Sequence, residues 1–112
     1  MPSDQPLGAD RRVLVTGSRT WPYPADVWSA LDLPRQMVAP GGRLVVVHGD
    51  ARAGADAHAR AWAERASGTS GAVVIQERHP ADWARYGRPA GLMRNEEMVM
   101  AGAGECLAFL VE

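Results

Sequence analysis

The sequence predicts an α/β domain: a three-layer, Rossmann-like fold with a parallel sheet of about four strands and helices on both faces. Short apolar runs alternate along the chain with segments of helical periodicity, and the connections between them are short. Residues 44–47 (Leu-Val-Val-Val) are continuously apolar, as expected of a strand buried on both sides. Right-handed crossovers between parallel strands then place helices on both faces.

The four strands are expected at residues 12–16, 43–47, 72–76 and 105–111. A first helix begins at Pro24, and Pro34 is expected to end or kink it because proline has no backbone N–H. Its apolar face consists of Val27, Trp28 and Leu31. A second helix covers residues 54–66. Its apolar stripe consists of Ala55, Ala59, Trp62, Ala63 and Ala66.

A third helix is expected to begin at Pro89 and to end at Gly102 and Gly104. Its apolar residues recur at helical spacing and are expected to belong to the core: Leu92, Met93, Val99 and Met100. Between the third strand and this helix, residues 78–88 are expected to form a polar loop that contains aromatic side chains.

Length and composition exclude several classes of protein. The 112 residues suit one domain at 11–112, preceded by a flexible leader at 1–10. The net charge of −1 gives no basic field of the kind that holds nucleic acid. We find no signal or membrane segment, so we expect a cytoplasmic protein. All 12 basic residues are arginine, which indicates a GC-rich bacterial or phage source.

Metal and hydrolase chemistry lack their usual sequence signals. The three histidines do not have the spacing of a metal site, and the single cysteine makes a structural zinc site improbable. No Gly-x-Ser-x-Gly elbow is present, so a serine hydrolase has no support. We therefore predict no metal.

The most informative segment is 48–56, His-Gly-Asp-Ala-Arg-Ala-Gly-Ala-Asp, which follows a strand and opens a helix. Such a loop is a typical anion site, because its amides and the helix dipole point at one place. Gly49 and Gly54 have P-loop spacing, but Ala55-Asp56 replaces Lys-Ser/Thr, so the loop better suits a single phosphate, a ribose or a carboxylate. Asp56 either accepts hydrogen bonds from sugar hydroxyls or caps its helix, and the sequence leaves both roles open.

Two further segments carry side chains suited to an anion. Gly17-Ser18-Arg19 ends the first strand, where the hydroxyl and amides suit a phosphate with Arg19 as its counter-charge. The alternative is a tight turn with a solvated arginine. In the third helix, Arg94 and Asn95 point toward the ligand if the first turn faces the same edge of the sheet. The alternative there is an ordinary charged helix face.

Asp82, Trp83 and Tyr86 follow the third strand. An aromatic pair beside a carboxylate suits one wall of a base or sugar pocket. For Trp83 we favour a packing role in which the ring covers a helix end, and the roles of Asp82 and Tyr86 stay open.

Together these segments resemble the YspA-like, cpYpsA-related branch of the SLOG superfamily, which also contains the DprA and Lonely Guy ("lysine decarboxylase-like") proteins. Four motifs carry the resemblance: Gly17-Ser18-Arg19, the segment 48–56, Asp82-Trp83-x-x-Tyr86-Gly87 and Ala90-Gly91-x-x-Arg94-Asn95-x-x-Met98. The resemblance implies a Rossmann-like fold that binds a nucleotide or a nucleotide-derived, ribose-phosphate ligand at the carboxyl edge of the sheet. Carried over by position, the ligand-binding residues are Gly17, Ser18, Arg19, Gly49, Arg52, Gly54, Asp56, Arg94 and Asn95.

The resemblance also leaves two alternatives to simple binding. Some relatives cleave the N-glycosidic bond of nucleoside monophosphates, which needs a carboxylate near the anomeric carbon; Asp56 and Asp82 are the candidates. In Lonely Guy relatives this carboxylate is a glutamate on an element after the fourth strand, and we expect that part of the family domain to be missing here. An exposed last strand would then favour pairing with a second copy, as in a homo-oligomeric interaction protein. No cofactor is implied.

Overall fold

The computed structural model describes residues 10–110. The strands are β1 (Arg11–Gly17), β2 (Arg43–His48), β3 (Val73–Arg78) and β4 (Glu105–Phe109). The helices are α1 (Pro24–Gln36), α2 (Ala55–Ala66), α3 (Trp83–Tyr86) and α4 (Ala90–Ala101). All strand pairs are parallel, and the sheet order is β3-β2-β1-β4. The predicted α/β fold is confirmed, while the predicted leader lies outside the described residues except for Asp10.

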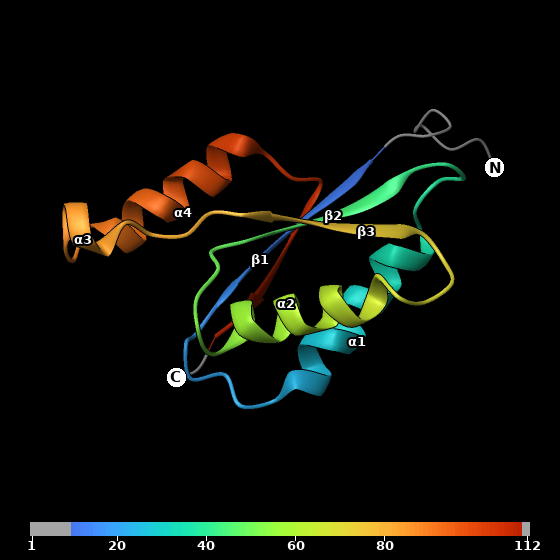
Figure 1. Ribbon diagram of the computed structural model, residues 1–112, viewed down its shortest axis with the longest axis horizontal. Helices are drawn as coiled ribbons and strands as arrows, with labels where there is room; N and C mark the ends of the chain where they lie inside the picture. Colours follow the sequence, from blue (N-terminus) through green and yellow to red (C-terminus); the bar gives the residue numbers. More distant parts are fainter. Residues whose placement is uncertain (1–9, 111–112) are drawn as a thin grey trace.

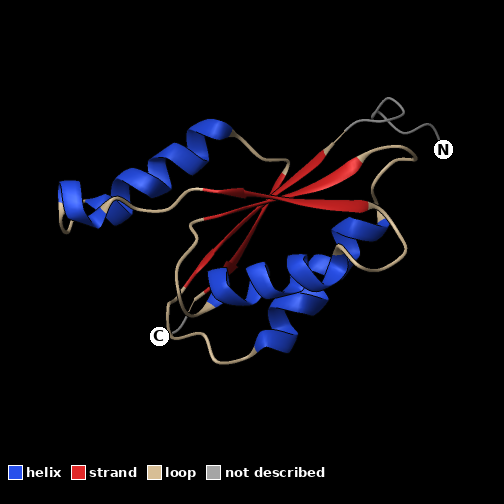
Figure 2. Ribbon diagram, viewed as in Figure 1, coloured by secondary structure: helices blue, strands red, loops and turns tan. Residues whose placement is uncertain are grey.

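The sheet is the central layer of the molecule (Figure 2). Helices α1 and α2 lie together on one side of it, and α4 with the short α3 lies on the other (Figure 1). This three-layer arrangement follows from the right-handed βαβ crossovers expected of a parallel sheet. None of the helices within residues 10–110 has the length and apolar character that a membrane span needs.

The larger core lies between the sheet and the α1/α2 layer. Val13 and Val15 of β1, together with Leu31 of α1, are fully buried there. The predicted stripe of α2 is confirmed, because all five of its members are buried in this core: Ala55, Ala59, Trp62, Ala63 and Ala66. The Trp62 indole N–H donates to Asp32 Oδ1 at 2.9 Å, so the buried ring keeps a hydrogen-bond partner.

The opposite face of the sheet carries a much smaller core, in which Met98 of α4 packs against Leu14, Val45 and Val47. Cys106, in register with Leu14, points to this face and is exposed. The core positions predicted for this helix are wrong, because all four side chains are 41–86% exposed: Leu92, Met93, Val99 and Met100. The residues buried instead are Ala90, at the start of the helix, and Met98, which packs against the sheet.

Two local predictions also need correction. Helix α1 continues through Pro34 to Gln36, and Pro34 itself is buried. Pro34 lacks the N–H that would bond to the Ala30 carbonyl, so the helix loses one hydrogen bond there and still includes the two residues that follow. The predicted loop at 78–88 contains the helix α3, because Asp82 Oδ1 accepts the Arg85 N–H at 3.1 Å and caps that turn.

Candidate functional site

A cavity of about 540 Å³ lies beyond the carboxyl ends of β2 and β3. The loop at residues 49–53 forms one side of it, and Pro80 and Ala81 after β3 contribute to the wall. Arg19, Trp83 and Arg94 reach it from three other segments. In open α/β sheets this edge is the usual place for a ligand, because the loops after parallel strands converge there.

The loops after β1 and β2 lock together behind this cavity. Gly54 has a φ of +76°, and a Cβ atom at this position would collide with the backbone of Ser18 and Arg19. The Ser18 carbonyl accepts the Ala55 N–H, the first of α2, at 3.2 Å. Ser18 in turn donates its own N–H to the Phe109 carbonyl at 2.8 Å. Residue 54 is therefore glycine because another chain segment lies directly against it.

The start of the β2 loop is fixed from inside the protein by His48, which is fully buried. Its Nδ1 accepts the Asp50 N–H at 3.0 Å, so the other nitrogen, Nε2, donates to Gln76 Oε1 at 2.8 Å. Asp50 has a φ of 54°, a left-handed conformation that aspartate tolerates better than most residues. Its carboxylate lies 3.3 Å from Arg60 Nη1 of α2. These contacts give the loop one defined shape.

Asp56 ties the same loop to the first turn of α2. It is 7% exposed, and its Oδ2 accepts the Ala51 N–H at 3.4 Å. Burial raises the pKa of the Asp56 carboxyl, although the Ala51 N–H and the nearby Arg94 charge act in the opposite direction. The structure thus places this carboxylate beneath the loop, outside the cavity lining.

Arg94 crosses from α4 to the end of β2. Its Nη1 donates to the Gly49 carbonyl at 2.7 Å, and its Nε donates to Asn95 Oδ1 at 2.8 Å. A Cβ atom on residue 49 would collide with the Arg94 guanidinium and would come within 2.8 Å of an Asp56 oxygen. The glycine therefore lets a cation lie directly against the loop backbone. Asn95 supports Arg94 and is not part of the cavity lining.

The remaining cations at the cavity are Arg19 and Arg52. Arg19 Cζ lies 4.7 Å from the centroid of the Trp83 ring, a cation–π contact. Arg52 is exposed at the tip of the β2 loop. Within residues 10–110, neither guanidinium has a carboxylate within 4 Å. Arg19 and Arg52 thus bring to the cavity two positive charges that no carboxylate of the described residues contacts directly.

The structure brings together only part of the predicted site. Of the nine predicted ligand-binding residues, those that line the cavity are Arg19, Gly49, Arg52 and Arg94. Gly17, Ser18 and Gly54 belong to the interlocked loops behind it. The catalytic candidates Asp56 and Asp82 act in the described structure as a loop anchor and a helix cap.

Among the lining residues outside the predicted ligand-binding set, the charged or aromatic side chains are Asp50, which sequence reasoning did not single out, and Trp83, for which it favoured a packing role. The Trp83 ring does cover a helix end, since a Cβ on Gly91 of α4 would lie 3.1 Å from it, but it also faces the cavity. For Asp50, the sequence did hold a signal. An aspartate that follows a strand and a glycine is suited to a turn, because aspartate tolerates the left-handed conformation.

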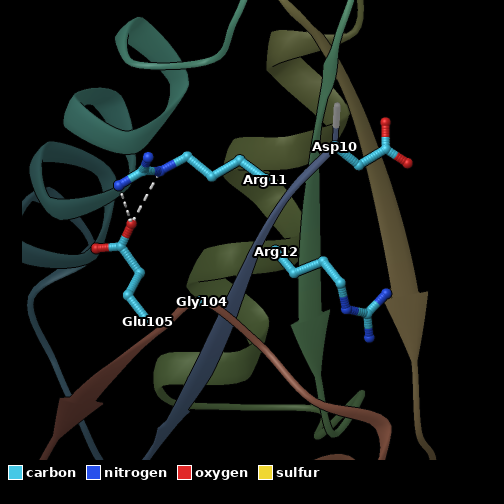
Figure 3. A pocket seen from close by; sticks show the side chains of 5 residues that line it. All are labelled: Asp10, Arg11, Arg12, Gly104 and Glu105. Carbon is cyan, nitrogen blue, oxygen red and sulfur yellow. Dashed lines mark hydrogen bonds and ion pairs between the residues drawn. The ribbon is translucent and has the colours of Figure 1, made fainter. Parts of the chain in front are cut away.

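A second cavity, of about 250 Å³, lies at the opposite edge of the sheet, where β1 and β4 begin (Figure 3). Its charged side chains already have partners: Arg11 lies 3.0 Å from Glu105, and Arg43 lies 2.8 Å from Asp10. Arg12 points to the other side of β1 from Arg11 and pairs with Glu77 at 2.8 Å. These charges neutralise one another, so this cavity has much less free positive charge to attract an anion than the first cavity has.

No three of the His, Cys, Asp and Glu side chains in the described part of the chain gather closely enough to hold a metal ion. The cavity at the carboxyl edge is therefore best described by its arginines, its backbone loop and its one aromatic ring. Arg94 and Trp83 come from elements on the α4 side of the sheet, so the cavity needs that layer in place.

Comparison with known proteins agrees with this architecture. The family model for the YspA, cpYpsA-related SLOG family matches residues 11–86, from β1 through α3. The Gene 61 protein of Mycobacterium phage D29 is 51% identical over 102 residues, which cover 88% of this chain and 76% of the relative. No solved structure matches significantly. Since the family match covers both strand-end loops and the segment with Trp83, the chain belongs to the YspA, cpYpsA-related SLOG family.

Proposed function

We propose that the cavity at the carboxyl edge binds a nucleotide or a nucleotide-derived, ribose-phosphate ligand. Membership of the SLOG family suggests nucleotide-related ligands in general. The observation that carries the proposal for this chain is the convergence of Arg19, Arg52 and Arg94 on one cavity beside an exposed aromatic ring.

The anionic part of the ligand is assigned to the arginines. Arg19 and Arg52 lack acidic partners among residues 10–110, so a phosphate group meets cations that are free to contact it. Guanidinium groups suit this role because they bind phosphate oxygens in pairs. Arg94 is already fixed by the Gly49 carbonyl and contributes charge at a defined position.

The base or sugar is assigned to the Trp83 side of the cavity. The ring is 45% exposed, and one face is in contact with Arg19. A guanidinium over a tryptophan leaves a flat surface suited to stacking, and it keeps the cation next to the bound base. The loop below needs no rearrangement, because His48 and Asp56 already hold its backbone. A preformed site loses less conformational entropy on binding.

The first experiment is a thermal-shift screen of the purified chain with nucleoside monophosphates, NAD, ADP-ribose and cyclic nucleotides. A ligand at about 100 times its dissociation constant stabilises the fold by roughly 2.7 kcal/mol, which raises Tm by several degrees. We expect a shift with one chemical class, and no shift with any of these compounds would contradict the proposal.

Variants then test the site assignment. Arg19→Ala and Arg52→Ala should each weaken binding of the compound that gives the shift by about tenfold, as expected for a charge-assisted contact. Arg88→Ala is the matched control, because Arg88 is exposed and does not line the cavity. Equal affinities in all three variants, measured by calorimetry, would remove the arginines from the site.

The glycosidase alternative stays a prediction. It requires a carboxylate that faces the cavity, and the lining residue of that kind is Asp50, whose carboxylate lies against Arg60. Assay of free base released from nucleoside monophosphates at high protein concentration tests this activity. Release that is lost in Asp50→Asn would favour it over simple binding.

A further inference from the structure

His79, directly after β3, lies between two carboxylates. Its Nδ1 is 2.8 Å from Glu97 Oε2, and its Nε2 is 2.8 Å from Glu77 Oε2. The side chain is 13% exposed. A neutral imidazole has one N–H and can donate to only one of these oxygens, whereas the protonated ring donates to both. The observed geometry is therefore that of the imidazolium.

The two carboxylates belong to different layers of the molecule. Glu77 is on β3 and is held by Arg12 of β1, whose two terminal nitrogens each lie 2.8 Å from a Glu77 oxygen. Glu97 is on α4 and its side chain is 62% exposed. His79 therefore connects a rigid ion pair in the sheet to a helix on its surface. The charged groups that face it are Glu77, with Arg12 behind it, and Glu97.

Helix α4 has few other attachments, and it carries a wall of the proposed binding site. Its buried residues are Ala90 and Met98. Arg94, one turn before Glu97, reaches the Gly49 carbonyl and lines the cavity. Anything that holds Glu97 in place also holds Arg94 in place, because residues three apart lie on neighbouring turns of one helix face.

We propose that His79 is a positioning residue, whose protonated form holds α4 and with it Arg94 at the cavity, so that anion binding weakens as the pH rises. The predicted effect on anion binding rests on the proposed function. The contact between His79 and α4 does not, because it can be tested without a ligand.

The direction of the pH effect follows from the surroundings of His79. Burial by itself lowers the pKa of the ring, but the hydrogen bonds and charges of Glu77 and Glu97 outweigh it and raise the pKa above the usual 6.5. The contact is therefore complete below about pH 6.5 and is lost as the pH rises through the raised pKa. When His79 loses its proton, we expect Glu97 to move away from the ring, because Glu97 is more exposed than Glu77.

The first test uses the protein without ligand. Amide hydrogen exchange between pH 5.5 and pH 9, expressed as protection factors, should show α4 losing protection by roughly three- to fivefold across the titration of His79, as expected for a partly exposed ion pair. Glu97→Gln should remove this pH dependence and lower the His79 pKa measured by NMR. Glu96→Gln, its exposed neighbour on α4, is the matched control and should behave as wild type. Protection of α4 that is independent of pH would overturn the proposal.

The second test uses NAD as the probe, because the charge of its diphosphate is constant over this pH range. The dissociation constant of the wild type should increase by roughly three- to fivefold between pH 5.5 and pH 9, and that of His79→Gln should be high and constant. NAD binding that does not depend on pH would overturn the role of His79 and leave the proposed function standing. An absence of NAD binding together with pH-dependent protection of α4 would instead count against the proposed function for this ligand and support the His79 contact.

Discussion

The two faces of the sheet are packed very differently. On the α1/α2 face, Val13, Val15 and Leu31 are fully buried in a continuous core. On the α4 face, Met98 packs against a few sheet residues, while Leu92 and Met100 on the same helix are exposed. The difference indicates that one face supplies most of the stability of the domain, while the other holds α4 and its part of the cavity wall through a small number of contacts.

The sharpest test of this comparison is a pair of truncations, one on each face. Leu31→Ala should destabilise the fold by about 3–5 kcal/mol, because it leaves a cavity in the large core. Met98→Ala should cost about 2 kcal/mol, the lower end for such a change, because α4 can move to fill the gap. Urea unfolding of both variants measures the difference. Equal losses would show that the two faces contribute equally.

Acid unfolding tests the ion pair between Arg12 of β1 and Glu77 of β3, which lies on the α4 face of the sheet. Arg12 and, after it, His79 lower the pKa of Glu77 to about 2. A lowered carboxyl pKa gives stability that is present above the unfolded value near 4.5 and is lost as the pH falls through about 2. Solvent reaches both partners, so we expect the loss to be about 1 kcal/mol.

Glu77→Gln should remove this component of the pH dependence between pH 4.5 and pH 2. Glu64→Gln is a suitable control, since Glu64 is 59% exposed and lies 3.9 Å from its partner Arg78. Urea unfolding at several acidic pH values checks the prediction. Parallel curves for wild type and Glu77→Gln would mean that the pair contributes nothing measurable.

The smallest expected effect is at Met100, which is 86% exposed on α4. Met100→Ser should change the free energy of unfolding by no more than about 0.5 kcal/mol, as is usual for surface positions. A larger loss would show that this side of α4 is covered in solution. Light scattering of wild type and variant in the same experiment tests the predicted homo-oligomer directly.

The fold was predictable because each strand and each of the three longer helices carries a local signal, whereas the short helix α3 was predicted as part of a loop. The strand of β2 is a continuous apolar run, and α2 has a regular stripe that faces the sheet. The orientation of α4 was not predictable from hydrophobicity, because its most apolar side chains are exposed while Met98 and Arg94 face inward. The hydrogen bond from Arg94 to the Gly49 carbonyl requires the side of α4 that carries Arg94 to face the rest of the protein, whatever the hydrophobicity of the other sides.

The candidate site was predictable in its position and less so in its individual roles. Glycine-containing strand ends located the edge, and Arg19, Arg52 and Arg94 do meet there. The sequence could not show that Asp56 turns under the loop, or that Trp83 both covers α4 and faces the cavity. Such choices depend on distances between segments far apart in the chain. The contact between His79 and Glu97, 18 residues apart, is a further example.

Cys106 gives the comparison of the two faces a practical consequence. It is the one cysteine of the chain, it is exposed, and it lies in β4 in register with Leu14, the residue against which Met98 packs. A thiol-reactive fluorophore would therefore attach at a single place, on the face of the sheet that α4 covers and outside the cavity at the carboxyl edge. The natural chain thus contains its own labelling point, from which movements of α4 can be followed optically without introducing a new residue.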